Sequence, residues 1–309
     1  MTIVPPYLKQ GDTIGLVCPS GYMPLEKART AIVVLKEWGF EVRVGVTVGL
    51  KYNYFAGRDE ERLDDLQQMM DDDSVKAILC ARGGYGLSRI IDKLDFKKFR
   101  KHPKWIMGYS DITVLHAHIY SNYKIASLHS PMAAAFNPAE AGQVEDEYKN
   151  EYVQSLRKAL IGEKAEYSCK PHPFNRNGKA DGGLIGGNLS LLAHLAGTNS
   201  AFNPKNKILF IEDVGEYIYN IDRMLYQLKR SGMSEKLNGL IVGGFTEMKD
   251  TTIPFGQTVE EVIRDAVKEY DFPVCFGFPV SHTKENYALK VGVKYQLSVN
   301  EKRIMNVEL

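Results

Sequence analysis

The 309-residue sequence has few cysteines, almost no net charge and no long apolar segment. Its four cysteines lie far apart and none belongs to a C-x-x-C pair, which excludes the common zinc and disulfide frameworks. A formal net charge of +1 argues against a nucleic-acid-binding protein, since such proteins usually carry a basic excess. No basic start precedes an apolar stretch, and no apolar run reaches the roughly 20 residues of a membrane span. We therefore expect a cytoplasmic protein without nucleic-acid or membrane partners.

Short apolar segments alternate with segments of helical spacing in the first half of the chain. The expected strands are 13–17, 40–44, 75–80 and 105–107. The expected helices are 25–38, 58–70 and 111–120. This alternation is typical of a parallel sheet with helices on both faces, so we predict a doubly wound α/β domain over residues 1–135. The pattern then weakens, which predicts a connecting region over 136–180, with a loop at 137–142 and a polar helix at 145–160.

A second α/β domain with mixed strands is expected over residues 181–309. It opens with a glycine-rich segment, 181–188, which we interpret as a loop before a helix at 189–196. The further strands expected are 207–211, 240–242, 274–276 and 291–299. The further helices expected are 217–231 and 257–269.

Ser110 follows a short apolar strand and precedes a helix, in the segment Gly108-Tyr109-Ser110-Asp111-Ile112. In a parallel sheet, ligands bind beside the carboxyl ends of the strands. A serine at such a turn exposes its hydroxyl, and the amide of Asp111 would point at the same place. The spacing is that of the nucleophile elbow G-x-S-x-G, except that Ile112 replaces the last glycine. Ser110 or Asp111 would equally suit a helix N-cap, so spacing alone leaves both interpretations open.

A glycine-rich segment, Arg82-Gly83-Gly84-Tyr85-Gly86, also follows an expected strand. Glycines at this position let backbone amides approach a ligand closely. The amides could bind a phosphate or form an oxyanion hole beside the serine of the neighbouring strand. The spacing matches neither the P-loop nor the dinucleotide-binding pattern, which leaves a nucleotide site with little support. A plain tight turn is the simpler interpretation.

An acid and a histidine stand near the ends of two strands in the second half. Glu212 follows the strand 207–211, and His282 lies in the loop after the strand 274–276. A serine nucleophile needs a base to take its proton, and the base needs an acid to fix its tautomer. The chain order Ser110, Glu212, His282 is one of the orders known for such triads. The acidic residues Glu212 and Asp213 at this strand end could instead cap the next helix. A histidine in a loop, such as His282, often only makes hydrogen bonds and takes no part in catalysis.

These segments occur in the order seen in the serine LD-carboxypeptidase family, which the chain resembles from about Gly11 to Val299. The glycine-rich segment, the Gly108-to-Thr113 segment and the strand end at Glu212 and Asp213 all take part. Two further segments, Gly186-Gly187-Asn188-Leu189 and Gly277-Phe278-Pro279 before His282, complete the match. Family members often carry Gly-His before the catalytic histidine, whereas this chain has Phe278-Pro279-Val280-Ser281 there. This difference bears on which subgroup of the family the chain resembles, more than on the chemistry.

The resemblance implies a role for each residue. Ser110 matches the family's nucleophile, His282 its general base, and Glu212 the acid that orients the histidine. The backbone amides of Asp111 and Gly84 would form the oxyanion hole. The resemblance also implies a homodimer, no metal or organic cofactor, and release of the terminal D-alanine from a murein tetrapeptide in cell-wall recycling.

An exopeptidase must also hold a free carboxylate, for which the candidates are Arg82, Gly83, Gly187 and Asn188. Two alternatives remain for the function. A microcin C-type self-immunity peptidase would use the same chemistry on a peptidyl or aminoacyl nucleotide. A non-catalytic ligand-binding protein could use the same two-domain scaffold, because fold does not dictate function.

Overall fold

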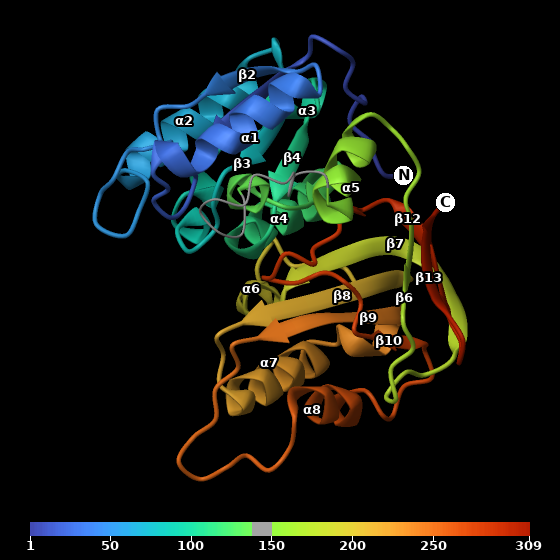
Figure 1. Ribbon diagram of the computed structural model, residues 1–309. Coiled ribbons are helices and arrows are strands. Elements are labelled where there is room, and N and C mark those ends of the chain that lie inside the picture. Colours follow the sequence, from blue (N-terminus) through green and yellow to red (C-terminus); the bar gives the residue numbers. More distant parts are fainter. Residues whose placement is uncertain (138–149) are drawn as a thin grey trace. The chain divides into compact units, whose positions relative to one another are not determined.

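The computed structural model describes residues 1–137 and 150–309 (Figure 1). They form two compact units, Met1–Glu163 with Tyr287–Lys290, and Lys164–Asn286 with Val291–Leu309. The predicted loop at 137–142 and the first part of the predicted helix at 145–160 fall largely outside the described residues. The division into domains 1–135 and 181–309 with a connection between them stays a prediction. None of the described helices is long and apolar enough to cross a membrane.

The first unit is built on a sheet with the strand order β11-β5-β4-β3-β1-β2. Its strands are β1 (Thr13–Val17), β2 (Glu41–Val44), β3 (Val75–Cys80), β4 (Trp105–Gly108), β5 (Ser127–His129) and β11 (Leu289–Val291). Strands β1 to β5 pair in parallel throughout. Strands β3 and β4 are buried apart from the exposed Lys76, which explains why their sequences are otherwise apolar. The short strand β5 was not predicted, because three residues carry too little pattern.

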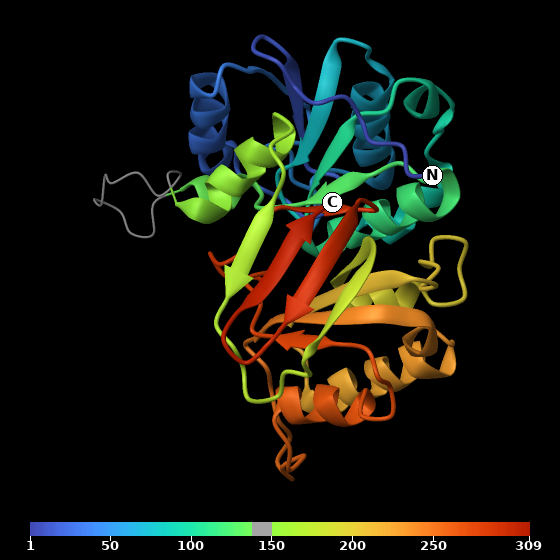
Figure 2. The same cartoon turned by 90° about the vertical axis from the view of Figure 1, so that its right-hand side faces the viewer.

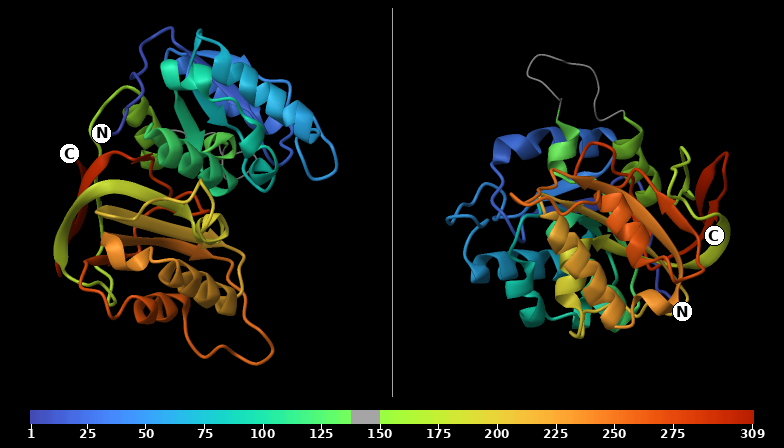
Figure 3. Two further views of the ribbon diagram at one scale, coloured as in Figure 1. Left: turned by 180° about the vertical axis from the view of Figure 1, so that it is seen from behind. Right: turned by 90° about the horizontal axis from the view of Figure 1, so that it is seen from below.

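Helices cover both faces of this sheet. They are α1 (Leu25–Glu37), α2 (Asp59–Asp71), α3 (Lys97–Lys101), α4 (Thr113–Tyr123) and α5 (Glu151–Leu160). Helix α1 lies on one face, and α2 and α4 lie on the other (Figure 1 and Figure 3). The predicted doubly wound fold is therefore confirmed. The strand order 2-1-3-4-5 means that successive strands are added on one side of β1 and then on the other, so the order reverses between β1 and β3. In such sheets, ligands bind at the carboxyl ends of the strands beside this point.

The second unit is built on a mixed sheet with the order β10-β9-β8-β7-β12-β13-β6. Its strands are β6 (Glu166–Cys169), β7 (Gly178–Asn188), β8 (Lys207–Val214), β9 (Leu237–Thr246), β10 (Val274–Phe276), β12 (Lys294–Val299) and β13 (Ile304–Glu308). Strands β7 to β10 are parallel, whereas β12, β13 and β6 pair antiparallel, side by side in Figure 2. The helices are α6 (Leu189–Leu195), α7 (Ile218–Arg230) and α8 (Val259–Ala266). The prediction of mixed strands is confirmed.

Two predictions about individual elements are wrong. Residues 181–188 are not a loop but most of β7, and their glycines serve close contact with β8. A Cβ added at Gly186 would stand 2.0 Å from the carbonyl oxygen of Phe210, so no larger residue fits there. The expected strand at 291–299 is interrupted at Gly292, whose φ of +91° turns the chain between β11 and β12.

Short 3-10 turns complete the described structure. They are Leu87–Arg89, Ile91–Lys93, Ser110–Ile112, Ala133–Phe136 and Ser234–Lys236.

Candidate active site

Ser110 lies in a strained turn at the carboxyl end of β4. Its φ of +63° is in the left-handed region, which residues other than glycine rarely adopt. Non-glycine residues in this conformation cluster at functional sites. Gly108, two residues earlier, has φ +146°, and a Cβ there would stand 2.9 Å from a side-chain carbon of Ile112. A serine on a sharp strand-to-helix turn is the geometry of a nucleophile elbow. The N-cap of α4 is Ile112, so neither Ser110 nor Asp111 holds that position.

The glycine-rich segment after β3 lies directly against this serine. A Cβ added at Gly83 would stand 2.9 Å from the Cβ of Ser110 and 3.2 Å from its Oγ. The next residue, Gly84, is exposed and has φ +98°, and a Cβ there would stand 2.7 Å from the Tyr54 hydroxyl. Gly83 thus lies directly against Ser110, and only glycine permits this close approach.

The side chain of Asp111 is buried beneath the turn, with 1% of its surface exposed. Its Oδ2 accepts hydrogen bonds from the Ser20 hydroxyl at 2.6 Å and from the Leu87 amide at 2.9 Å. Burial raises the pKa of this carboxyl, although both hydrogen bonds act to lower it. Ser20 was not singled out from the sequence, because only the strand order brings the end of β1 beside this turn.

The Arg82 side chain is exposed, and its Nη1 donates a hydrogen bond of 2.6 Å to the carbonyl oxygen of Tyr22. This bond orients the guanidinium group at the carboxyl edge of the sheet. A role in binding the substrate carboxylate stays a prediction.

Glu212 and His282 form a hydrogen-bonded pair in the second unit. The Glu212 Oε2 lies 2.5 Å from the His282 Nδ1, and the glutamate is fully buried, while 13% of the histidine side chain is exposed. Glu212 lies within β8, which runs on to Val214 rather than ending at Ile211 as predicted. His282 stands in the loop after β10. A carboxylate on Nδ1 fixes the tautomer that leaves Nε2 to act as a base.

Opposing effects set the proton affinity of this histidine. Burial lowers the pKa of His282, but the hydrogen bond and the charge of Glu212, together with the charges of Asp213 and Glu247, raise it more. The pKa therefore lies above its ordinary value of 6.5. An imidazolium that forms during a reaction would be stabilised by the same carboxylate.

Asp213 and Asn188 form a second buried pair beside Glu212. The Asp213 carboxylate accepts hydrogen bonds from the Asn188 side chain at 2.8 Å and from the Ser190 amide at 2.9 Å. Burial, foremost, raises the pKa of Asp213 to about 6. Asn188 is 3% exposed and also caps α6 through its side-chain oxygen, and the neighbouring Gly187 has φ +140°. Their predicted contact with substrate stays a prediction.

No group of three or more histidine, cysteine, aspartate or glutamate side chains in the described ranges is arranged to hold a metal ion.

Comparison with known proteins gives consistent matches over the chain. Residues 14–130 match a family described as LD-carboxypeptidase N-terminal domain, and residues 181–297 match LD-carboxypeptidase C-terminal domain. A probable murein peptide carboxypeptidase of Bacillus subtilis is 37% identical, over 96% of this chain and 92% of the relative.

Two further proteins are similar over nearly their whole length. The crystal structure of muramoyltetrapeptide carboxypeptidase from Oxalobacter formigenes superposes with a TM-score of 0.85 at 29% identity, covering 96% of this chain and 99% of that chain. The microcin C7 self-immunity protein MccF of Escherichia coli is 26% identical, over 97% of this chain and 94% of the relative.

Proposed function

Because the chain belongs to the LD-carboxypeptidase family and is a carboxypeptidase, we propose that it releases the terminal D-alanine of a murein tetrapeptide through an acyl-enzyme on Ser110. The observation that carries the proposal is the left-handed turn that holds Ser110 against the Gly83 backbone. The names of the similar carboxypeptidases, which refer to murein peptide and to muramoyltetrapeptide, support the proposed substrate. Their family also sets aside the alternative of a non-catalytic binding protein.

The hydrogen-bonded pair of Glu212 and His282 supports the proposed triad. Ser110 belongs to the first unit, and its two partners belong to the second. The proposal therefore requires the His282 Nε2 to come within hydrogen-bond reach of the Ser110 Oγ during the reaction.

The first half of the proposed reaction forms the acyl-enzyme. His282 Nε2 takes the hydroxyl proton of Ser110, and the Oγ attacks the carbonyl carbon of the L-centre that precedes D-alanine. The carbonyl electrons move to oxygen, where the amides of Asp111 and Gly84 would bind the developing charge. The tetrahedral intermediate collapses, the C–N bond breaks, and the D-alanine amine leaves with the proton from His282.

Hydrolysis completes the cycle. A water molecule loses a proton to His282 and attacks the ester carbonyl, and the departing Ser110 Oγ takes that proton back. The candidates for binding the carboxylate of D-alanine remain Arg82 and Gly83 of the first unit and Gly187 and Asn188 of the second. We also propose that the protein is a homodimer, which light scattering of the purified protein tests. We propose further that it is located in the cytoplasm, which cell fractionation tests.

Replacing Ser110 by alanine tests the proposal. Ser110→Ala should reduce turnover by roughly a thousandfold or more, since no nucleophile remains. Mass spectrometry of murein tetrapeptide should show tripeptide and D-alanine with the native protein and neither with the variant. A fluorophosphonate should label the native protein at Ser110. Unchanged turnover by Ser110→Ala would overturn the assignment.

A matched control for this experiment is Ser127→Ala in β5. Ser127 is fully buried, and its hydroxyl has no hydrogen-bond partner within the described part of the chain. Losing this hydroxyl should leave turnover unchanged, which separates the loss of a nucleophile from the loss of a serine.

A second candidate substrate is a peptidyl or aminoacyl nucleotide, as the similarity to the microcin self-immunity protein suggests. Two exposed aromatic side chains favour it: Tyr85, within the glycine-rich segment, is 49% exposed, and Tyr54, next to Gly84, is 53% exposed. Exposed aromatic rings of this kind can stack on a nucleobase. Comparing the kcat/KM for murein tetrapeptide with that for an aminoacyl sulfamoyl adenylate decides between the two substrates.

A further inference from the structure

We propose that Asp111 and Ser20 are positioning residues. Their side chains hold the turn at Ser110 and the glycine-rich segment 82–86 in a fixed position relative to one another. This inference rests on the proposed role of Ser110. It assigns to the Asp111 carboxylate a task separate from that of the Asp111 amide in the oxyanion hole.

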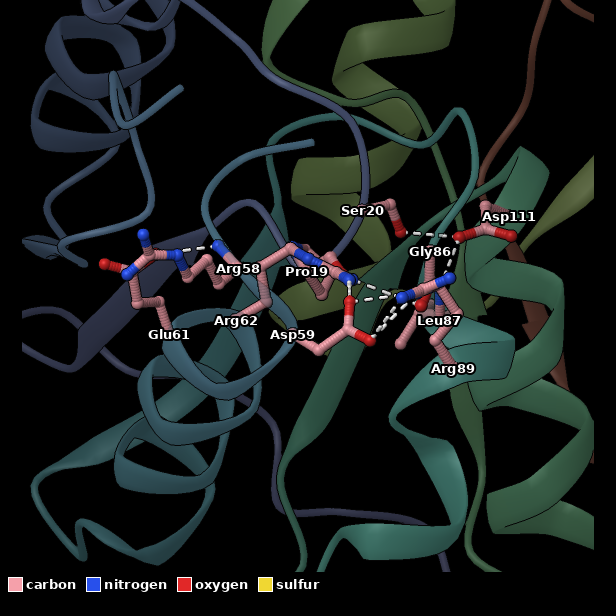
Figure 4. A network of polar contacts seen from close by, with 10 residues as sticks. All are labelled: Pro19, Ser20, Arg58, Asp59, Glu61, Arg62, Gly86, Leu87, Arg89 and Asp111. Atoms are coloured by element: carbon pink, nitrogen blue, oxygen red, sulfur yellow. Dashed lines mark hydrogen bonds and ion pairs between the residues drawn. The ribbon is translucent and has the colours of Figure 1, made fainter. Parts of the chain in front are cut away.

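One carboxylate oxygen connects three loops that follow three different strands. The Asp111 Oδ2, after β4, accepts from the Ser20 hydroxyl, after β1, and from the Leu87 amide, after β3 (Figure 4). Strands β1, β3 and β4 are neighbours in the sheet, so their loops meet at one edge. Asp111 and Ser20 are 1% and 0% exposed, which shields both hydrogen bonds from water. The Leu87 bond holds the end of the segment that carries Gly83 and Gly84.

A buried arginine joins two of these loops a second time. Arg62, on α2, is fully buried, and its Nη1 donates to the carbonyl oxygens of Pro19 at 2.6 Å and Gly86 at 3.1 Å (Figure 4). Its charge is balanced by Asp59 one turn earlier, which also pairs with Arg89. A Cβ at Gly86 would stand 2.6 Å from Arg62 Nη1, so the glycine lets the guanidinium group approach the loop backbone.

The strained backbone at Ser110 explains why such links are needed. A left-handed non-glycine residue costs of order 1–3 kcal/mol and persists only where its surroundings over-determine it. Asp111 is the next residue, so fixing its side chain also fixes the peptide plane that carries the oxyanion-hole amide. A displacement of about 1 Å at a reacting group can cost roughly a hundredfold in rate. Loosening the link should therefore affect the chemical step more than substrate binding.

Four variants test the proposal. Ser20→Ala removes one donor, Asp111→Ala removes the acceptor, and Asp111→Asn keeps an acceptor oxygen without the charge. Ser127→Ala is the control, because it removes a buried hydroxyl that makes no hydrogen bond in the described structure. The measurements are kcat and KM on murein tetrapeptide, the rate of fluorophosphonate labelling, amide hydrogen exchange at Leu87, and thermal unfolding.

We expect kcat to fall about tenfold in Ser20→Ala and about a hundredfold in Asp111→Ala, with KM changed less than about threefold. Fluorophosphonate labelling should slow in parallel, because the probe uses the same nucleophile and oxyanion hole. Asp111→Asn should recover part of the loss, and the Leu87 amide should exchange faster in Asp111→Ala. If the Asp111 variants do not fold, Ser20→Ala decides alone.

Three outcomes distinguish a failure of this inference from a failure of the proposed function. If Ser110→Ala abolishes turnover but Ser20→Ala keeps the kcat and labelling rate of Ser127→Ala, the inference is wrong and the function stands. A lowered unfolding temperature with unchanged kcat would likewise show that the link is only structural. If Ser110→Ala keeps its turnover, the proposed function itself is wrong.

Discussion

Replacing Glu212 by glutamine is the sharpest test of the proposed base. The side chain is fully buried and its Oε2 lies 2.5 Å from the His282 Nδ1, so the isosteric change removes a charge without leaving a cavity. A glutamine whose amide group faces Nδ1 donates a hydrogen bond there. The proton then sits on Nε2, which is the wrong tautomer for a base.

The known cost of losing the acid of a triad gives the size of the effect on kcat, and the structure gives the sign of the effect on the pKa of His282. Loss of the orienting acid in a triad costs roughly 10³- to 10⁴-fold in kcat, which corresponds to about 4–5 kcal/mol in the barrier. Burial has the largest single effect on the pKa of His282 and lowers it, whereas Glu212 gives the largest opposing effects, ahead of the charges of Asp213 and Glu247. In Glu212→Gln the pKa of His282 should therefore fall. Since the base acts as neutral imidazole, the acid limb of the kcat/KM profile should move to lower pH.

Release of D-alanine measured over a pH series, together with NMR titration of His282, checks both effects. The His282 resonance is identified by its loss in His282→Gln, because the chain has seven histidines. A Glu212→Gln variant that keeps kcat within about threefold and an unshifted acid limb would refute the role of the pair.

Two further predictions concern the first unit. His116 is fully buried, and its Nε2 contacts the Gly108 carbonyl oxygen at 2.8 Å, while burial lowers its pKa to about 4. In the unfolded chain the imidazole of His116 takes up a proton near pH 6.5, so the free energy of unfolding should fall by about 3 kcal/mol as the pH drops from 6.5 to 4. Urea unfolding over this pH range should show the loss in the native protein and in the control His102→Gln, whose histidine is exposed. The variant His116→Gln should lack it. Gly83→Ala places a Cβ 2.9 Å from that of Ser110, and steady-state kinetics should show kcat reduced about a hundredfold.

Both sheets were predictable where buried strands carry continuous apolar runs. Strands β3, β4 and β8 each begin within two residues of the predicted positions, because bulky apolar side chains leave little choice of structure. Strand β7 was not predictable in this way. Its glycines resemble a loop, and only the backbone of β8 lying against Gly186 shows why a strand needs them.

The residues of the candidate site likewise differ in how far the sequence alone could predict them. Ser110 and the glycine-rich segment stand out because each follows an apolar strand with an unusual turn. Ser20 stands in an ordinary turn, and no pattern around it indicates a role. Its contact with Asp111 spans 91 positions and depends on β1 lying beside β3, which is a property of strand order.

Strand order also bears on the strained turn at Ser110. Strands β1, β3 and β4 are consecutive neighbours and parallel, so their carboxyl ends deliver three loops to one edge. A single carboxylate can then fix all three loops, which no residue could do if β4 lay at the far edge of the sheet. Because β4 is buried in a close-packed sheet, we expect strain at Ser110 to be relieved by movement of the loops rather than of the strand. On the proposed role of Asp111, its buried hydrogen bonds oppose that movement and so keep Ser110 in the left-handed conformation.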